Sequence, residues 1–131
     1  MRILLDTHIL LWAVSAPERL PEPDRATILN PTNDVLFSAV NIWEIAIKAA
    51  QRRPEFQARP EVVAEEALDI GFIELPVYAS AAARVADLPL LHGDPFDRLL
   101  IAQAIAEPAV LYTADARLPR YSELVRRVPA R

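Results

Sequence analysis

Short apolar runs alternate along this chain with longer segments whose apolar residues recur three and four positions apart. The runs predict buried strands at Ile3–Leu5, Asp34–Phe37, Phe72–Leu75 and Ala109–Tyr112, with a possible edge strand at Leu124–Val128. Because strands separated by helices favour parallel pairing, we expect an α/β fold. Its predicted architecture is a three-layer sandwich, with a central, mainly parallel sheet of four to five strands flanked by helices.

The helical segments are bounded mostly by proline, since the chain has twelve Pro and two Gly. We predict helices at His8–Val14, Asp24–Asn30, Ala39–Gln51, Pro60–Asp69, Tyr78–Leu88 and Arg98–Ala106, and a short helix near Arg117. The helix at Tyr78–Leu88 is rich in alanine, which predicts close packing against a neighbour. The helix at Arg98–Ala106 is apolar on nearly every side, which predicts that it is buried.

The composition fits one globular domain over residues 1–131, because 53% of the residues are hydrophobic. The absence of cysteine excludes disulfides and thiolate zinc sites and is typical of a reducing compartment, so we expect a cytoplasmic protein. The apolar N-terminal stretch loosely resembles a secretory signal. However, Asp6 and His8 interrupt it, and it is too short to span a bilayer, so we expect no membrane association.

The net charge of −4 argues at first against a nucleic-acid partner. Thirteen of the fourteen basic residues are arginine, however, and the planar arginine fork suits phosphate. Four carboxylates gathered on metal ions would also leave the remaining surface formally neutral. Net charge therefore does not exclude nucleic acid, and the candidate phosphate contacts are Arg52, Arg53, Arg98 and Arg117.

Three aspartates occupy similar local positions. Asp6 ends the first strand run and Asp115 follows the fourth, while Asp97 lies at the third position of a helix that Asp94 caps. Each of them could serve only as a helix cap. In open parallel sheets, however, ligand sites lie at the carboxyl ends of the strands, so we expect the three aspartates on one rim.

Glu44 lies about two turns into the helix that follows the second strand. It shares one face with Asn41, Lys48 and Gln51, which on its own favours a solvated stripe containing a weak Glu44–Lys48 pair. The three aspartates favour instead the wall of a polar cleft. Four carboxylates on one rim would repel one another unless divalent cations were bound, and oxygen ligands suit Mg²⁺, with Mn²⁺ possible. Such cations activate water and stabilise displacement at phosphorus.

Four segments together carry a family resemblance: LLDTH (residues 4–8), SAVNIWEIA (38–46), DPFDRLLIAQA (94–104) and TAD (113–115). They resemble PIN-domain ribonucleases, and more narrowly the VapC toxins of type II toxin–antitoxin systems, in order and over nearly the whole chain. One departure is visible. Relatives often have a glycine soon after the helix that carries the glutamate, whereas this chain has none between Lys48 and Pro54.

The resemblance implies a magnesium-dependent endoribonuclease that a cognate antitoxin inhibits and that forms a homodimer. The family's acidic positions, which would be catalytic and metal-binding, match Asp6, Glu44, Asp97 and Asp115. Its supporting positions match Thr7, Asp94 and Thr113.

Two alternatives remain open. A phosphotransferase of the haloacid-dehalogenase kind would use Asp6 as nucleophile, but that class requires an acid where this chain has His8. A non-catalytic α/β module could use the acids only to bind a cation or a partner. His8 and His92 are more typical of packing or surface residues than of ligands, and Trp12 and Trp43 of core or interface residues.

Overall fold

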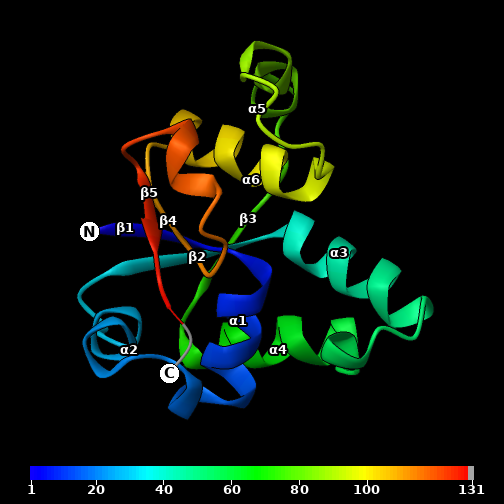
Figure 1. Ribbon diagram of the computed structural model, residues 1–131. Coiled ribbons are helices and arrows are strands. Elements are labelled where there is room, and N and C mark those ends of the chain that lie inside the picture. Colours follow the sequence, from blue (N-terminus) through cyan, green and yellow to red (C-terminus); the bar gives the residue numbers. More distant parts are fainter. Residues whose placement is uncertain (130–131) are drawn as a thin grey trace.

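A computed structural model of the chain, which describes residues 1–129, contains one five-stranded sheet (Figure 1). The strands are β1 (Arg2–Leu5), β2 (Asp34–Ser38), β3 (Ile73–Leu75), β4 (Val110–Thr113) and β5 (Val125–Arg127). Their order across the sheet is β3-β2-β1-β4-β5, and every neighbouring pair is parallel. The predicted parallel sheet is confirmed, including its edge strand at the C-terminal side.

Except in the alanine-rich segment, the helices follow the predicted segments with small shifts at their ends. They are α1 (Thr7–Ser15), α2 (Glu22–Ile28), α3 (Ala39–Ala50), α4 (Pro60–Ile70), α5 (Ala79–Arg84) and α6 (Pro95–Ala106). Short 3₁₀ turns lie at η1 (Pro17–Arg19), η2 (Pro54–Phe56), η3 (Val85–Asp87) and η4 (Leu118–Tyr121). No helix within residues 1–129 has the length and apolar composition that crossing a membrane requires.

Successive side chains of the inner strands point to opposite faces of the sheet, which produces two cores. Ile3 and Leu5 of β1 pack into one core with α1, α2 and α4. Leu4, between them, packs into the other core with Leu100 and Ile101 of α6. Figure 1 shows the sheet between these two groups of helices, so the predicted three-layer sandwich is confirmed.

The alanine-rich segment only partly fulfils its prediction. Helix α5 contacts α6, but it is shorter than expected, and Ala81 is its one buried residue. Tyr78, just before it, is 56% exposed. Close packing against a neighbour is therefore correct for one face of α5 and wrong for the rest.

The end of α3 explains how the chain manages without a glycine there. Arg52 adopts a left-handed backbone conformation with φ of 59°, which costs a side-chain-bearing residue some strain. Its N–H donates to the carbonyl of Ala49, and the N–H of Arg53 donates to that of Lys48. These two bonds form a Schellman motif, in which Arg52 occupies the position that glycine favours.

Candidate functional site

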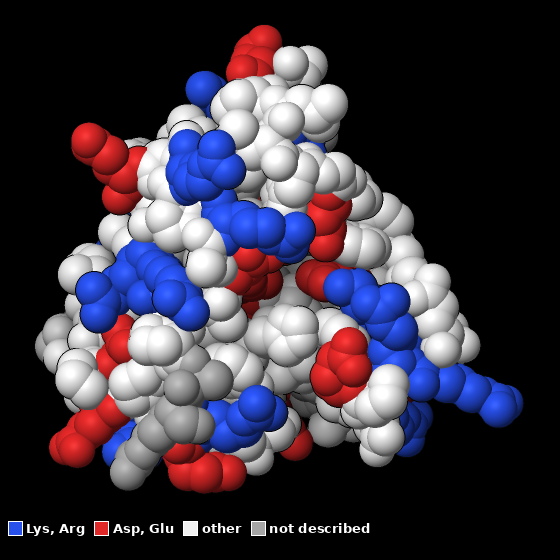
Figure 2. All heavy atoms as spheres, in the orientation of Figure 1, with Lys and Arg blue, Asp and Glu red and all other residues white. Residues whose placement is uncertain are grey.

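A pocket of about 390 Å³ opens at the carboxyl edge of the sheet, where β1 adjoins β4. The strand order reverses between β1 and β4, because β2 and β3 lie on one side of β1, and β4 and β5 on the other. Ligands bind at such switch points in open α/β folds. All four predicted acids and Asp94 line this pocket, together with His8, Trp12, Lys48, Ala114 and Arg117. Figure 2 shows acidic atoms deep in a central hollow, with Lys and Arg side chains around it.

Asp6 is held at the end of β1 by neutral donors. Its carboxylate caps α1 by accepting from the N–H of Thr7 at 2.6 Å, and its other oxygen accepts a short hydrogen bond from the Thr113 hydroxyl. Thr113 Oγ1 in turn accepts from the N–H of Asp115 at 3.0 Å. The ends of β1 and β4 are thereby tied together through Thr113, one of the predicted supporting residues.

Glu44 is held by a buried chain of hydrogen bonds. Thr7, with no exposed surface, donates its hydroxyl to Glu44 Oε1 at 2.6 Å and accepts from Asn41 Nδ2 at 3.0 Å. Asn41 also completes the capping box of α3 by accepting from the N–H of Ser38. Glu44 Oε2 lies 2.5 Å from Lys48 Nζ. Glu44 and Lys48 of the predicted face therefore line the pocket and form the expected pair, whereas Gln51, at the end of that face, is exposed.

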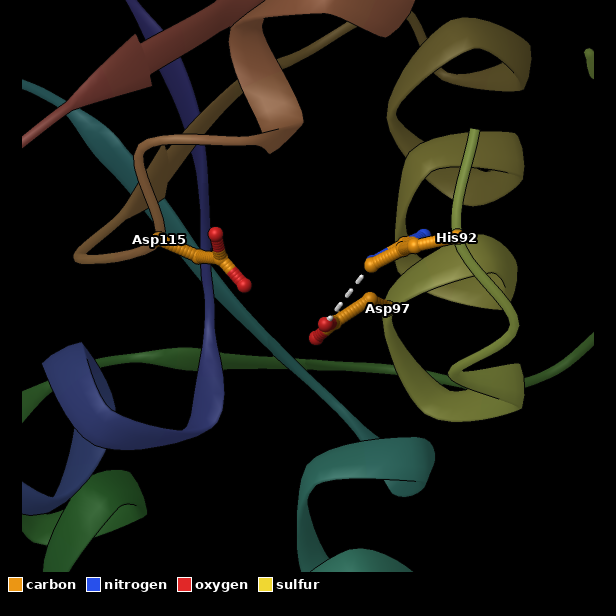
Figure 3. A group of neighbouring side chains, drawn as sticks. All are labelled: His92, Asp97 and Asp115. Atoms are coloured by element: carbon orange, nitrogen blue, oxygen red, sulfur yellow. Dashed lines mark hydrogen bonds and ion pairs between the residues drawn. The ribbon is translucent and has the colours of Figure 1, made fainter. Parts of the chain in front are cut away.

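Asp97 projects into the pocket from the first turn of α6. Asp94 caps this helix by accepting from the N–H groups of Phe96 and Asp97. His92, from the preceding loop, places Nε2 at 3.3 Å from Asp97 Oδ2 and Nδ1 at 2.9 Å from the Tyr121 hydroxyl. Figure 3 shows His92 and Asp97 side by side, with Asp115 facing them from the segment after β4.

Asp115 is neutralised by Arg117. The Arg117 guanidinium donates to both Asp115 oxygens, at distances between 2.7 and 3.2 Å, and its backbone N–H donates to Oδ1 at 2.8 Å. These contacts lower the pKa of the Asp115 carboxyl, mainly through the side-chain bonds from Arg117. Asp115 is therefore an anion whose charge is already balanced.

The pKa values of Asp97 and Asp6 are shifted in the opposite direction. Burial, followed by repulsion from Asp6, Asp94, Glu44 and Asp115, raises the pKa of Asp97 to about 8. Burial, together with the charge of Glu44, likewise raises the pKa of Asp6, and hydrogen bonds from Thr113 and Thr7 offset this only in part. Positive charge is therefore lacking at Asp6 and Asp97, which is where a bound cation would relieve the repulsion.

The donor set fits a hard divalent cation. Ligand atoms of His92, Asp97 and Asp115 all lie within 4.8 Å of one another. A cation with ligands at roughly 2.1 Å separates opposite ligands by about 4.2 Å, so this span is close to that of one coordination sphere. Half of the residues that line the pocket are carboxylates, and such oxygen donors suit Mg²⁺ and Mn²⁺.

The four candidate arginines lie in different settings. Arg117 reaches the pocket, whereas Arg52 and Arg53 are exposed after α3, with Arg53 at 3.8 Å from Glu55. Arg98 donates to the carbonyls of Val85, Leu88 and Pro89 and to the Tyr121 hydroxyl. It ties down the loop before α6, so the structure does not bring it together with the acids.

Of the other residues singled out from the sequence, some are packed inside the protein and one is exposed. His8 packs against the Phe56 ring at 5.2 Å and against Trp12, which is buried. Trp43 is 54% exposed and lines two apolar depressions, so a core position is wrong for it.

Sequence reasoning placed Lys48 on the wall of the polar cleft without a role of its own, and it did not single out Tyr121. It favoured a surface position for His92, which is wrong, because the His92 side chain is only 8% exposed. Lys48 had a usable signal, since it is the chain's only lysine and follows Glu44 by one turn. Tyr121 had none, because its contact with His92 joins residues 29 positions apart.

Comparisons with known proteins agree with this geometry. The PIN domain family matches residues 3–124. The chain is 33% identical over 121 residues to Ribonuclease VapC22 of Mycobacterium tuberculosis, covering 88% of each protein. The crystal structure of VapBC2 from Rickettsia felis, bound to a DNA fragment from their promoter, contains a similar chain with a TM-score of 0.71. At 20% identity, over 98% of this chain and 99% of that one, this last likeness concerns the fold.

A further match covers only part of a much larger protein. The chain is 31% identical over 115 residues to Enterobactin synthase component F of Escherichia coli and of Shigella flexneri. The aligned segment is 9% of those proteins and 87% of this chain. The whole synthase therefore says nothing about what this chain does.

Proposed function

The chain belongs to the PIN domain family and, within it, to the VapC-type ribonucleases, and on that premise we propose that it cleaves RNA with a divalent cation held in the acidic pocket. One observation carries this proposal. Five carboxylates surround a single pocket, and two of them, Asp6 and Asp97, have raised pKa values that a bound cation would reverse. We propose Mg²⁺ as the cation, with Mn²⁺ as a substitute.

Each acidic residue of the pocket has its own role in this proposal. Asp6 and Asp97 would hold the cation, and Glu44 and Asp115 would orient the groups around it. When bound, the cation would activate water and stabilise charge at phosphorus. Thr7 and Thr113 hold Glu44 and Asp6 in place, and Asp94 fixes the first turn of α6.

The surroundings of the pocket suit a polyanion. Basic side chains border the acidic hollow in Figure 2, and Arg117 lies in the pocket itself. Arg52 and Arg53 would add contacts to phosphates farther along the RNA. The chain would act as a single PIN domain over residues 1–131.

We propose that the protein is the toxin of a type II toxin–antitoxin pair and works as a homodimer in the cytoplasm. Its similarity to Ribonuclease VapC22, and to a chain from a VapBC structure, supports an antitoxin partner. The apolar depressions around Trp43 suit a partner's apolar side chains, because an exposed tryptophan is typical of interfaces.

Cleavage of a labelled single-stranded RNA pool tests the enzymatic proposal. We expect cleavage with Mg²⁺, none with excess EDTA, and a loss of at least about 1,000-fold in Asp6→Asn and Asp97→Asn. Asp34→Asn is the matched control, because Asp34 is an exposed aspartate at the opposite end of β2 from the pocket. Full activity in EDTA, or in either pocket variant, would exclude the proposal.

A further inference from the structure

Lys48 is the one lysine of the chain, and it lies inside the acidic pocket. Its side chain is only 16% exposed. Its ammonium lies 4.9 Å from the centre of the Phe56 ring and 5.7 Å from that of Phe96. Lysine is rarely withdrawn from water this far without a charged partner, so Lys48 must be considered together with Glu44.

Both oxygens of Glu44 already have a donor from the chain. Oε1 accepts from the Thr7 hydroxyl at 2.6 Å and Oε2 from Lys48 Nζ at 2.5 Å. The side chain is 4% exposed, so Glu44 has little freedom to turn elsewhere. A cation that approached Glu44 directly would have to displace the ammonium or share the oxygen with it.

The four acids therefore fall into two classes. Glu44 and Asp115 each have a cationic partner, namely Lys48 and Arg117. Asp6 accepts only from neutral donors, and within residues 1–129 the basic group nearest Asp97 is the imidazole of His92. The unbalanced negative charge of the pocket lies at Asp6 and Asp97.

We propose that Lys48 is a positioning residue that acts as a resident cation, keeping Glu44 out of the coordination sphere so that the pocket binds one divalent cation, centred on Asp97. This inference rests on the proposed function, since it takes the pocket to be a metal site. A second divalent cation beside Glu44 would meet the Lys48 ammonium within a few ångströms and be repelled.

Counting bound Mn²⁺ tests the inference without measuring activity. The wild-type protein should bind one Mn²⁺ per chain, by calorimetric titration and by electron paramagnetic resonance of the free ion. Lys48→Met frees Glu44, so we expect either a second bound ion or at least tenfold tighter binding of the first. Lys48→Arg, which keeps the charge, should retain one ion at wild-type affinity.

Arg59→Met is the matched control for the loss of one positive charge. Arg59 is 78% exposed and pairs with Glu61, away from the pocket, so Mn²⁺ binding should not change. Two ions in the wild-type protein would overturn the inference. So would Mn²⁺ binding in Lys48→Met that equals that of the wild type and of Arg59→Met.

Glu44→Gln keeps the inference testable if Lys48→Met does not fold, because glutamine has nearly the same shape. We expect it to bind Mn²⁺ within about fivefold of wild type, whereas Asp97→Asn should weaken binding more than a hundredfold. Equal losses in the two variants would place Glu44 among the direct ligands and overturn the inference. No Mn²⁺ binding by the wild type would remove the metal site altogether, a failure distinct from a count of two ions.

Discussion

The two walls of the acidic pocket hold their carboxylates in different ways. On the wall formed by β1 and α3, Asp6 and Glu44 are anchored by buried side chains of regular elements, chiefly Thr7, Asn41 and Thr113. On the opposite wall, the contacts come largely from loops. His92 precedes α6, and Asp115 follows β4.

The difference separates a preorganised wall from an adjustable one. Hydrogen bonds between buried elements fix Glu44 before any ligand arrives, whereas Asp115 pairs with an arginine whose side chain is 64% exposed. A surface ion pair of that kind contributes little to stability. We therefore expect the first wall to govern stability and the second to respond to the cation.

The largest expected effect is the pH dependence of the metal-free protein, to which Asp97 on the adjustable wall and Asp6 on the other contribute in the same direction. The pKa of Asp97 is about 8 in the folded protein and about 4 when unfolded, so the folded state binds the proton more tightly. Stability from this group is fully present below about pH 4 and is lost as pH rises through about 8. We expect the Tm to fall on the order of 10 °C across this range.

Thermal unfolding with and without Mg²⁺ measures this dependence. Saturating Mg²⁺ should abolish most of the fall, because the cation takes the place of the proton. Asp97→Asn should have a higher metal-free Tm at pH 8 than the wild type and a flatter profile. A wild-type Tm that rises between pH 5 and 8 without metal would contradict the raised pKa.

The preorganised wall is tested by Thr7→Val, which removes a hydroxyl without changing the shape of the side chain. Thr7 has no exposed surface. The substitution therefore leaves Glu44 Oε1 without its buried donor and Asn41 Nδ2 with one acceptor fewer. We expect the free energy of unfolding to fall by about 2–3 kcal/mol.

Urea denaturation measures that loss. Thr32→Val is the control, because Thr32 is exposed and donates only to Asn30, and it should change stability by less than about 0.5 kcal/mol. Equal effects from the two variants would mean that the buried chain of hydrogen bonds does not stabilise the wall.

More of the first wall than of the second could be predicted from the sequence, for a physical reason. Asp6 directly follows a buried strand, and parallel strands deliver their carboxyl ends to one edge, so its place followed from periodicity. Glu44 lies on a helix with a regular repeat, which left two environments open until the aspartates decided between them. These positions depend on local regularity that a sequence displays.

On the second wall, Asp97 and Asp115 were predicted from their local positions, but no local pattern encodes the contacts that hold them. The bond between His92 and Tyr121 spans 29 residues and two loops. Arg98 was a candidate phosphate contact because arginine suits phosphate, yet its donors bind carbonyls of the segment before α6. The same limit applies at Arg52, where the lack of glycine left the end of α3 undefined although a Schellman motif forms there.

Tyr121→Phe measures how much the loops contribute to the second wall. The Tyr121 hydroxyl lies within hydrogen-bond distance of the His92 ring, the His92 N–H and the Arg98 guanidinium, so its loss frees the imidazole beside Asp97. We expect a loss of about 1–1.5 kcal/mol in unfolding free energy and a reduction of less than about tenfold in RNA cleavage. If RNA cleavage fell as far as we expect for Asp97→Asn, this wall would have to be as preorganised as the other.

The smallest expected effect comes from Arg52→Gly, at the end of the helix that carries Glu44 and Lys48. The left-handed φ of 59° costs arginine about 1 kcal/mol and glycine almost nothing, although glycine loses more freedom on folding. The net expectation is a gain of about 0.5–1 kcal/mol in the urea-unfolding free energy, with Mn²⁺ binding unchanged. Gln51→Gly, next to it at φ −81°, should destabilise by a similar amount, so a matching gain there would mean that the strain at Arg52 is not the cause. Any weakening of RNA binding in Arg52→Gly alone would mark Arg52 as a phosphate contact, because the substitution leaves both walls of the pocket intact.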